Sequence, residues 1–197
     1  MRLTCQNDSK PGAKAYRTWL MLLLLLSAFL PPRIYGAEEA TEQDVKAAFV
    51  FNAVKFTEWP QNAFSSETAP IRIAVIGEED FAAKLSALLK DKKAHGRSFE
   101  VKKINTPADA KGVHVLYCPN AETKRFGQFY DFIKKTPALT IGESGQFLDA
   151  GGIINLLIED DQLRFEIHPE AAEAGNLVIS SRVMRLAKTI KKGEAKK

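Results

Sequence analysis

The chain has 197 residues, of which 45% are hydrophobic and 26% charged, the composition of a globular protein sized for one domain. Its formal net charge of +4 comes from the N-terminus, where the first 36 residues hold five basic side chains and one acidic one. In the remainder, basic and acidic residues are equal in number. Because phosphate backbones are bound by clustered basic residues, this balance excludes a nucleic-acid-binding protein.

Residues 1–37 have the pattern of a cleavable signal peptide. A positively charged stretch ends at Arg17 and is followed by an apolar run over Trp19–Leu30. This run is shorter than the roughly 18–20 residues that span a membrane, and it has the length of a signal-peptide core. Small residues for cleavage follow at Gly36 and Ala37. We expect export to the periplasm, with a retained inner-membrane anchor as the alternative.

The chain is divided into the signal peptide over 1–37, an α/β domain over 38–190 and a basic tail over 191–197. Because Cys5 lies in the leader, Cys118 is the only cysteine expected in the mature chain. An internal disulfide is therefore excluded, although the periplasm would permit one.

The first part of the domain alternates helix and strand patterns. A helix is predicted over 42–58, with Thr41 as its N-cap and Trp59-Pro60 at its end. Its apolar residues recur at helical spacing and predict one buried face, formed by Val45, Ala48, Phe49, Ala53 and Phe56. After a polar loop over 61–70, the pattern predicts strands over 71–76, 98–104, 113–118 and 138–141, and helices over 81–89 and 122–134.

The last third of the domain begins with a hairpin pattern. Apolar segments over 153–158 and 163–167 flank four polar residues and predict a β-hairpin. A short helix over 169–174 and a final helix over 181–190 follow. The whole pattern predicts a single α/β domain with a largely parallel sheet covered by helices, a late antiparallel β-hairpin and a C-terminal helix.

No local motif for catalysis is present in the sequence. Cys118 follows a predicted strand, and His114 lies four residues earlier, ~13 Å away along a strand and too far for a direct hydrogen bond. A buried, inert cysteine is therefore favoured over a nucleophile. The histidines at 95, 114 and 168 lack metal-ligand spacing, and the acidic run over 78–80 is explained by the dipole of the helix that it opens. We expect no metal, no cofactor and no enzymatic activity.

Four segments, taken in order, resemble a known family. They are FNAVKFTEWP over 51–60, IAVIG over 73–77, GGIINL over 151–156 with LRFEI over 163–167, and ISSRVMRLA over 179–187. Their order and their spread over nearly the whole domain make the chain similar to the YfiR-like family of periplasmic proteins.

The resemblance implies a periplasmic regulatory domain, often dimeric, with no active site of its own. In the best-known member, this domain holds an inner-membrane diguanylate cyclase inactive by binding its periplasmic portion. An outer-membrane lipoprotein sequesters the repressor and so releases the cyclase. The resemblance thus implies a negative regulator of a membrane signalling protein, in cyclic-di-GMP signalling. That member's disulfides do not carry over to this chain, and His168 stands where the family more often has Asn.

Residues that bind a partner or ligand are expected on the hairpin and beside it. They are Asn155, Arg164, Glu166, His168 and Arg182. Arg164 and Glu166 alternate with an inward Phe165 and so share the outer face of their strand. The alternative is structural: cross-strand pairing for Arg164 and Glu166, and hydrogen bonds at a loop or helix start for Asn155 and Arg182.

A hypothesis from another class is a periplasmic small-molecule binding module that acts with another sensor or a transport receptor. In an open α/β sheet, ligands bind in the crevice at the carboxyl ends of the strands. In this chain that crevice is expected near Gly77, Cys118 and Gly142.

Overall fold

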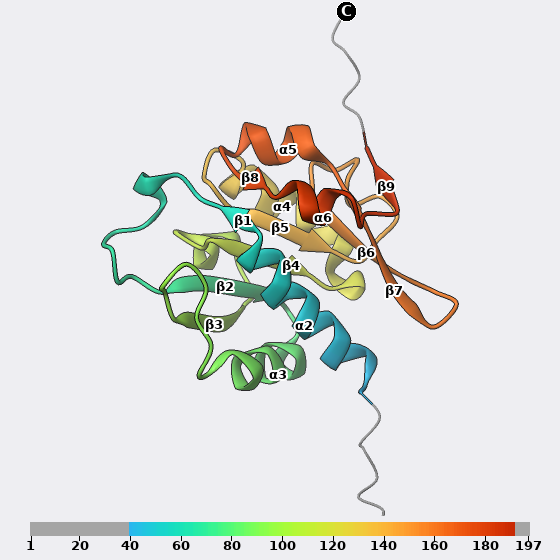
Figure 1. Cartoon of the computed structure of the whole chain (residues 1–197), viewed down its shortest axis with the longest axis horizontal. Coiled ribbons are helices and arrows are strands. Elements are labelled where there is room, and N and C mark those ends of the chain that lie inside the picture. Colours follow the sequence, from blue (N-terminus) through green and yellow to red (C-terminus); the bar gives the residue numbers. More distant parts are fainter. Residues whose placement is uncertain (1–39, 192–197) are drawn as a thin grey trace, which may run out of the picture. The chain divides into compact units, whose positions relative to one another are not determined.

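Three strands in the middle of the sheet are apolar on both faces, and this sets the architecture. They are β2 (Ile71–Ile76), β4 (Val115–Cys118) and β5 (Leu139–Gly142), in which every residue except Arg72 is buried. In the computed structural model, which describes residues 40–191, they lie at the centre of a seven-stranded sheet (Figure 1). A strand without a polar face must be covered on both sides, which requires helices above and below the sheet.

The sheet has the strand order β3-β2-β4-β5-β6-β7-β9. The pairs from β3 (Phe99–Ile104) to β6 (Ile154–Glu159) are parallel, β7 (Gln162–Ile167) returns antiparallel to β6, and β9 (Thr189–Ile190) lies parallel to β7. The predicted fold class is confirmed: the sheet is largely parallel and carries a late antiparallel hairpin. The chain runs from β2 outward to β3 and then back to β4 on the other side of β2. The strand order therefore reverses between β2 and β4.

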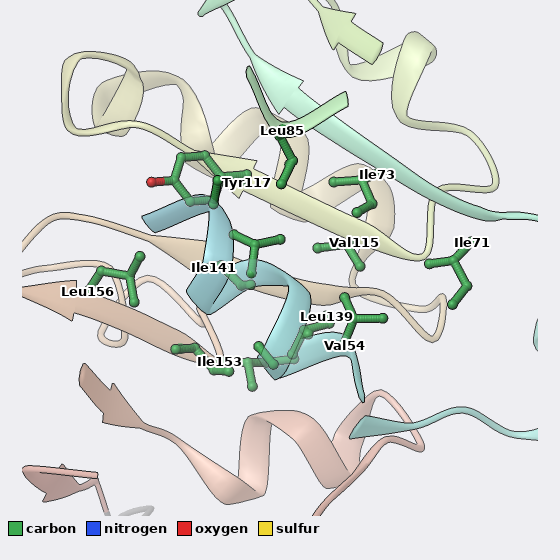
Figure 2. Close-up of a cluster of buried hydrophobic side chains, with 14 of the residues drawn as sticks. Val54, Ile71, Ile73, Leu85, Val115, Tyr117, Leu139, Ile141, Ile153 and Leu156 are labelled. Atoms are coloured by element: carbon green, nitrogen blue, oxygen red, sulfur yellow. The ribbon is translucent and has the colours of Figure 1, made fainter. Parts of the chain in front are cut away.

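Helices cover both faces of this sheet. On one face, α2 (Glu42–Lys55) and α3 (Glu79–Leu89) pack on the odd-numbered side chains of β2, β4 and β5, and Figure 2 shows Val54 and Leu85 meeting Ile73, Val115 and Leu139. On the other face, α4 (Thr123–Ile133) inserts three buried side chains, Phe126, Phe129 and Ile133. Full burial of each such side chain contributes about 1.5–3 kcal/mol.

Helix α2 differs from its prediction in length and in the face that it buries. Thr41 caps it as expected, since its hydroxyl accepts from the Asp44 N–H at 3.3 Å. The helix ends at Lys55 because the next residues form β1 (Thr57–Glu58), which pairs with β8 (Val178–Ile179). Of the five predicted residues, Ala53 is buried, Phe49 and Phe56 are partly buried against the core, and Val45 and Ala48 are exposed. The buried residues of the helix are Ala47, Val50, Ala53 and Val54, whose short side chains let it lie close to the sheet.

The C-terminal helix is shorter than predicted. Helix α5 (Pro169–Ala174) is confirmed, but α6 covers only Ser181–Met184. The chain then extends as β9, because the N–H groups of Lys188 and Lys191 donate to the carbonyls of Phe165 and Ile167, both at 2.8 Å. These bonds satisfy part of the open edge of β7, which a continued helix would have left unpaired.

The predicted signal peptide lies outside the described residues, and so does the basic tail after Lys191. Within residues 40–191, no helix combines the length and the apolar character needed to cross a membrane.

The hairpin between β6 and β7 turns through two residues in the left-handed region. Asp160 and Asp161 have φ of 49° and 57°, and Glu159 pairs with Gln162 across the turn. This is the geometry of a type I′ turn, which favours Asn-Gly or Asp-Gly because both central residues need positive φ.

We therefore expect Asp161→Gly to stabilise the domain by about 0.5–1 kcal/mol, since glycine adopts this conformation without steric cost. Urea denaturation followed by circular dichroism measures the change. Gln162→Gly is the matched control, because the extended backbone at that position should make glycine destabilising. A variant Asp161→Gly no more stable than wild type would contradict the turn geometry.

Candidate functional site

A pocket of about 280 Å³ lies at the carboxyl edge of the sheet. Its walls are Glu42 and Lys46 of α2, Asn120 after β4, Glu143 after β5 and residues 156–159 of β6. Parallel strands bring these segments together because their carboxyl ends meet at one edge of the sheet. The lining combines carboxylates and one ammonium group with the apolar side chains of Leu156 and Ile158.

Lys46 is the central charge of this pocket. Its Nζ lies 2.5 Å from Glu42 Oε1 and 3.0 Å from Glu143 Oε2. The side chains of Lys46 and Glu143 are each only 13% exposed. Burial opposes the charged form of Lys46, but its hydrogen bonds to the two carboxylates outweigh that effect and raise its pKa above the ordinary value.

Tyr117 and Glu78 extend this network into the protein. The Tyr117 hydroxyl donates to Glu143, and Figure 2 shows that hydroxyl at the rim of the buried cluster. Burial, reinforced by the charge of Glu143, raises the pKa of Tyr117, so the phenol stays protonated. Burial and the same charge also raise the pKa of Glu78, which accepts from Gln43 Nε2 at 3.4 Å.

Lys46 and Tyr117 are suited to holding charge and donating hydrogen bonds, and less to acting as bases in proton transfer. A general base must be unprotonated at working pH, whereas Lys46 and Tyr117 both have raised pKa values. Within residues 40–191, no group of three or more His, Cys, Asp or Glu side chains is placed to hold a metal ion.

The crevice expected beside Gly77, Cys118 and Gly142 is filled by the protein's own side chains. A Cβ on Gly142 would overlap the ring of Phe147, and one on Gly77 would overlap the carboxylate of Glu122. Burial raises the pKa of the Cys118 thiol to about 12, so the thiolate is not available as a nucleophile. The pocket opens instead on the opposite face of the sheet, beside α2.

Two of the five predicted binding residues are brought together by the hairpin. Asn155 on β6 and Glu166 on β7 are cross-strand partners, and Asn155 Nδ2 donates to Glu166 Oε2 at 3.2 Å. Asn155 has no exposed surface, and its Oδ1 has no hydrogen-bond partner. Asn155 therefore cannot itself touch a partner protein and positions the Glu166 carboxylate.

The other three predicted residues lie apart from one another. Arg164 is exposed on β7 and donates to Gln162 Oε1 at 2.7 Å. His168 precedes α5, half-buried, with its Nδ1 unpartnered and its Nε2 3.9 Å from Glu170. Arg182 is exposed on α6, with its guanidinium 5.9 Å from the centre of the Phe56 ring. That these residues bind a partner or ligand stays a prediction.

The sequence predicted a binding crevice at the carboxyl ends of the strands, and the pocket lies at that edge beside Asn120 and Glu143, but its lining residues were not predicted. Its residues lie in four segments between 42 and 159, and only the parallel sheet joins them. One signal was present: Lys46 stands beside the small buried residues of α2, four residues after Glu42, so a lysine near the buried face had a carboxylate within reach.

Fold and site together define a doubly wound α/β domain whose carboxyl edge carries a pocket lined by charged side chains and in which β6 and β7 form a projecting hairpin. The chain belongs to the YfiR/HmsC-like family, whose model matches residues 43–188. This family is a regulatory one. A search of the curated proteins finds no match.

Solved structures support the fold alone. A conserved domain protein from Vibrio cholerae O1 biovar El Tor strain N16961 is similar with a TM-score of 0.51 and 16% sequence identity. The match covers 74% of this chain and 60% of that one, so the chain spans well under two thirds of that protein's length. The ABC domain in complex with L-Trp from Streptococcus pneumoniae has a TM-score of 0.44 at 11% identity, over 61% of this chain and 55% of that one. This second likeness establishes neither fold nor ligand.

Removal of the Lys46 charge tests the network at the carboxyl edge. Lys46→Met should lower the free energy of unfolding by about 3 kcal/mol, because it leaves the mostly buried Glu143 carboxylate without its cation. Lys84→Met is the matched control on the neighbouring helix. Its pair with Asp44 at 2.8 Å is more exposed and should cost less than about 1 kcal/mol. Equal effects of the two substitutions in urea denaturation would contradict the central role of Lys46.

Proposed function

We propose that this protein is a periplasmic negative regulator that binds the periplasmic portion of a membrane signalling protein, with a diguanylate cyclase as the leading partner. The observation that carries the proposal is membership of the YfiR/HmsC-like family over residues 43–188. The protein would then act by binding alone. While it is bound to the cyclase, the cyclase stays inactive, and an outer-membrane lipoprotein that sequesters the protein would restore cyclase activity.

The β6–β7 hairpin offers a surface for such binding. It projects beyond the rest of the sheet (Figure 1), and β9 pairs only with Glu166 and Ile167 of β7. The β7 backbone around Arg164 therefore lies outside that ladder. Near the tip, Ile158 is 45% exposed, while Asp160 and Asp161 add negative charge. An open edge on β7, with an exposed apolar residue on the adjacent β6 and charges near the turn, suits docking by a partner segment that adds to the sheet.

The two arginines expected to contact a partner reach opposite sides of this region. Arg164 lies on the face of the hairpin away from α2, since its neighbours Leu163 and Phe165 pack on the core beneath α2. Arg182 lies on α6, which packs on the same face of the sheet as α2. A partner that binds the hairpin edge would contact Arg164, whereas a partner that binds the face covered by α6 would contact Arg182. Substitution of each arginine therefore distinguishes the two binding modes.

Deletion of the gene should raise intracellular cyclic-di-GMP, and restoration should lower it again. Restoration with Arg164→Glu should fail to lower it, because charge reversal in the interface weakens binding at least tenfold. Arg185→Glu is the matched control, an exposed arginine on the same C-terminal segment outside the predicted set. An unchanged cyclic-di-GMP level on deletion would overturn the cyclase assignment.

The pocket at the carboxyl edge supports a second candidate function, the binding of a small molecule that controls the partner. Three of its lining residues are carboxylates, from Glu42, Glu143 and Glu159, beside the apolar Leu156 and Ile158. Glu42 and Glu143 are paired with Lys46, and Glu159 is paired with Lys188, so an amine that carries an apolar group would bind by taking the place of Lys188 at Glu159.

A thermal-shift screen of amines and amino acids tests this candidate. A ligand at 100-fold its Kd should stabilise the protein by about 2.7 kcal/mol. Asn120→Trp, which fills the pocket, should abolish the shift, whereas Asn62→Trp on an exposed turn at the opposite edge should retain it. A shift that survives Asn120→Trp would place the ligand elsewhere.

A further inference from the structure

The loop between β1 and β2 is fastened to the amino edge of the sheet by an aromatic and cationic stack. The ring of Phe64 stacks on His114, with centroids 4.3 Å apart and planes inclined by 18°. The guanidinium carbon of Arg97 lies 3.8 Å from the same Phe64 centroid. Arg97 also donates to the carbonyls of Ser66 and Ala69 at 2.7 and 2.9 Å. His114 and Arg97 therefore help to hold residues 60–70 on the sheet, together with the packing of Phe64 against the core and against Trp59, whose ring centroid lies 6.4 Å away.

The hydrogen bonds of His114 fix its protonation state. Nδ1 lies 3.0 Å from the backbone nitrogen of Arg72, which can only donate, so Nδ1 must accept. Nε2 lies 3.1 Å from the carbonyl oxygen of Ala63, which can only accept, so Nε2 must carry the proton. His114 in the closed loop is thus the neutral Nε2–H tautomer, and it joins the loop to the start of β2.

Protonation of His114 is incompatible with this arrangement. A second proton on Nδ1 would face the Arg72 N–H, so that two donors oppose each other. The charged groups that face the ring are Arg72 on β2 and Arg97 before β3, both cations. Burial lowers the pKa of His114, the two arginines lower it further, and only the Ala63 carbonyl acts in the other direction.

We propose that His114 is an acid-sensitive latch, which holds residues 60–70 on the amino edge while neutral and releases them when protonated. This inference goes beyond the proposed function and needs no partner. In the open loop, His114 has an ordinary pKa of about 6.5 and takes up a proton that the closed loop excludes. Above that pH the open population is therefore constant and at its lowest, and below it the open population grows up to about tenfold per pH unit, until the pKa of the closed state is reached.

Amide hydrogen exchange of the purified protein tests the latch directly, since the Arg72 N–H is the group that His114 accepts. After correction for intrinsic exchange, the protection of the Arg72 amide should fall up to about tenfold per pH unit below pH 6.5. Val75, in the centre of β2, should keep its protection. The chain has three histidines, so the ring signals of His114 can be assigned by NMR, and they should titrate below pH 6.5.

Two variants separate the latch from a general effect of acid. His114→Gln should remove the pH dependence of Arg72 exchange, because glutamine does not titrate. His95→Gln is the matched control at the same edge, where His95 contacts the Val54 carbonyl at 3.0 Å, and it should keep the pH dependence. Arg72 protection that is constant between pH 7.5 and 5, or a dependence lost in His95→Gln, overturns the proposal. These two readouts remain decisive even if His114→Gln does not fold.

Discussion

The two-sided burial of β2, β4 and β5 is the constraint on which the rest of the structure depends. These strands have almost no polar side chain to offer to water, so helices must cover both faces of the sheet. Helix α2 meets this requirement with small residues, which let it lie along the sheet and bring Lys46 to the carboxyl edge. The hairpin departs from this pattern, because β7 alternates polar residues with apolar ones that are buried or partly buried, so one of its faces remains polar.

The carboxyl edge of the sheet, its amino edge and the hairpin differ in the kinds of side chain that they carry. The carboxyl edge gathers Lys46, Glu143 and Tyr117 into a network in which each charge has a partner. The amino edge is closed by the stack of Phe64 and His114. The hairpin side retains exposed backbone and side chains of both polarities. A protein that binds a partner needs a rigid scaffold with a reachable surface, and the covered sheet with its projecting hairpin supplies both.

The sequence predicted the strands and the fold class well, because apolar runs bounded by glycine and proline are strong local signals. It predicted the buried face of α2 only in part, with Ala53 correct, since that helix carries a second apolar stripe with Val45 and Phe49, which competed with the fully buried alanines and valines. The last helix was predicted too long because residues 186–190 have helical spacing, whereas the open edge of β7 recruits the end of this stretch as a strand. Tertiary hydrogen bonding decided the outcome there.

The candidate site was harder to predict for a related reason. Asn155 and Glu166 were both singled out, and their pairing follows from hairpin register, which is local information. Lys46 and Glu143 are almost a hundred positions apart and meet only through the order of the strands. Likewise, the sequence predicts a polar loop over 61–70, and nothing near it in the sequence indicates that Phe64 stacks on His114. Contacts of this kind depend on the order of the strands in the sheet and not on the local pattern of apolar and polar residues.

The burial of Cys118 has a consequence for the life of the protein outside the cytoplasm. In the oxidising compartment proposed for it, a reachable thiol forms mixed disulfides, but this one is 1% exposed and its pKa is raised to about 12. Its reactivity is therefore governed by how often α4 lifts from the sheet. In the folded molecule the Cys118 thiol stays unmodified. In a molecule that has lost its core, the thiol would be exposed to oxidation. Oxidation of Cys118, the cysteine within residues 40–191, would therefore require the loss of the packing around it.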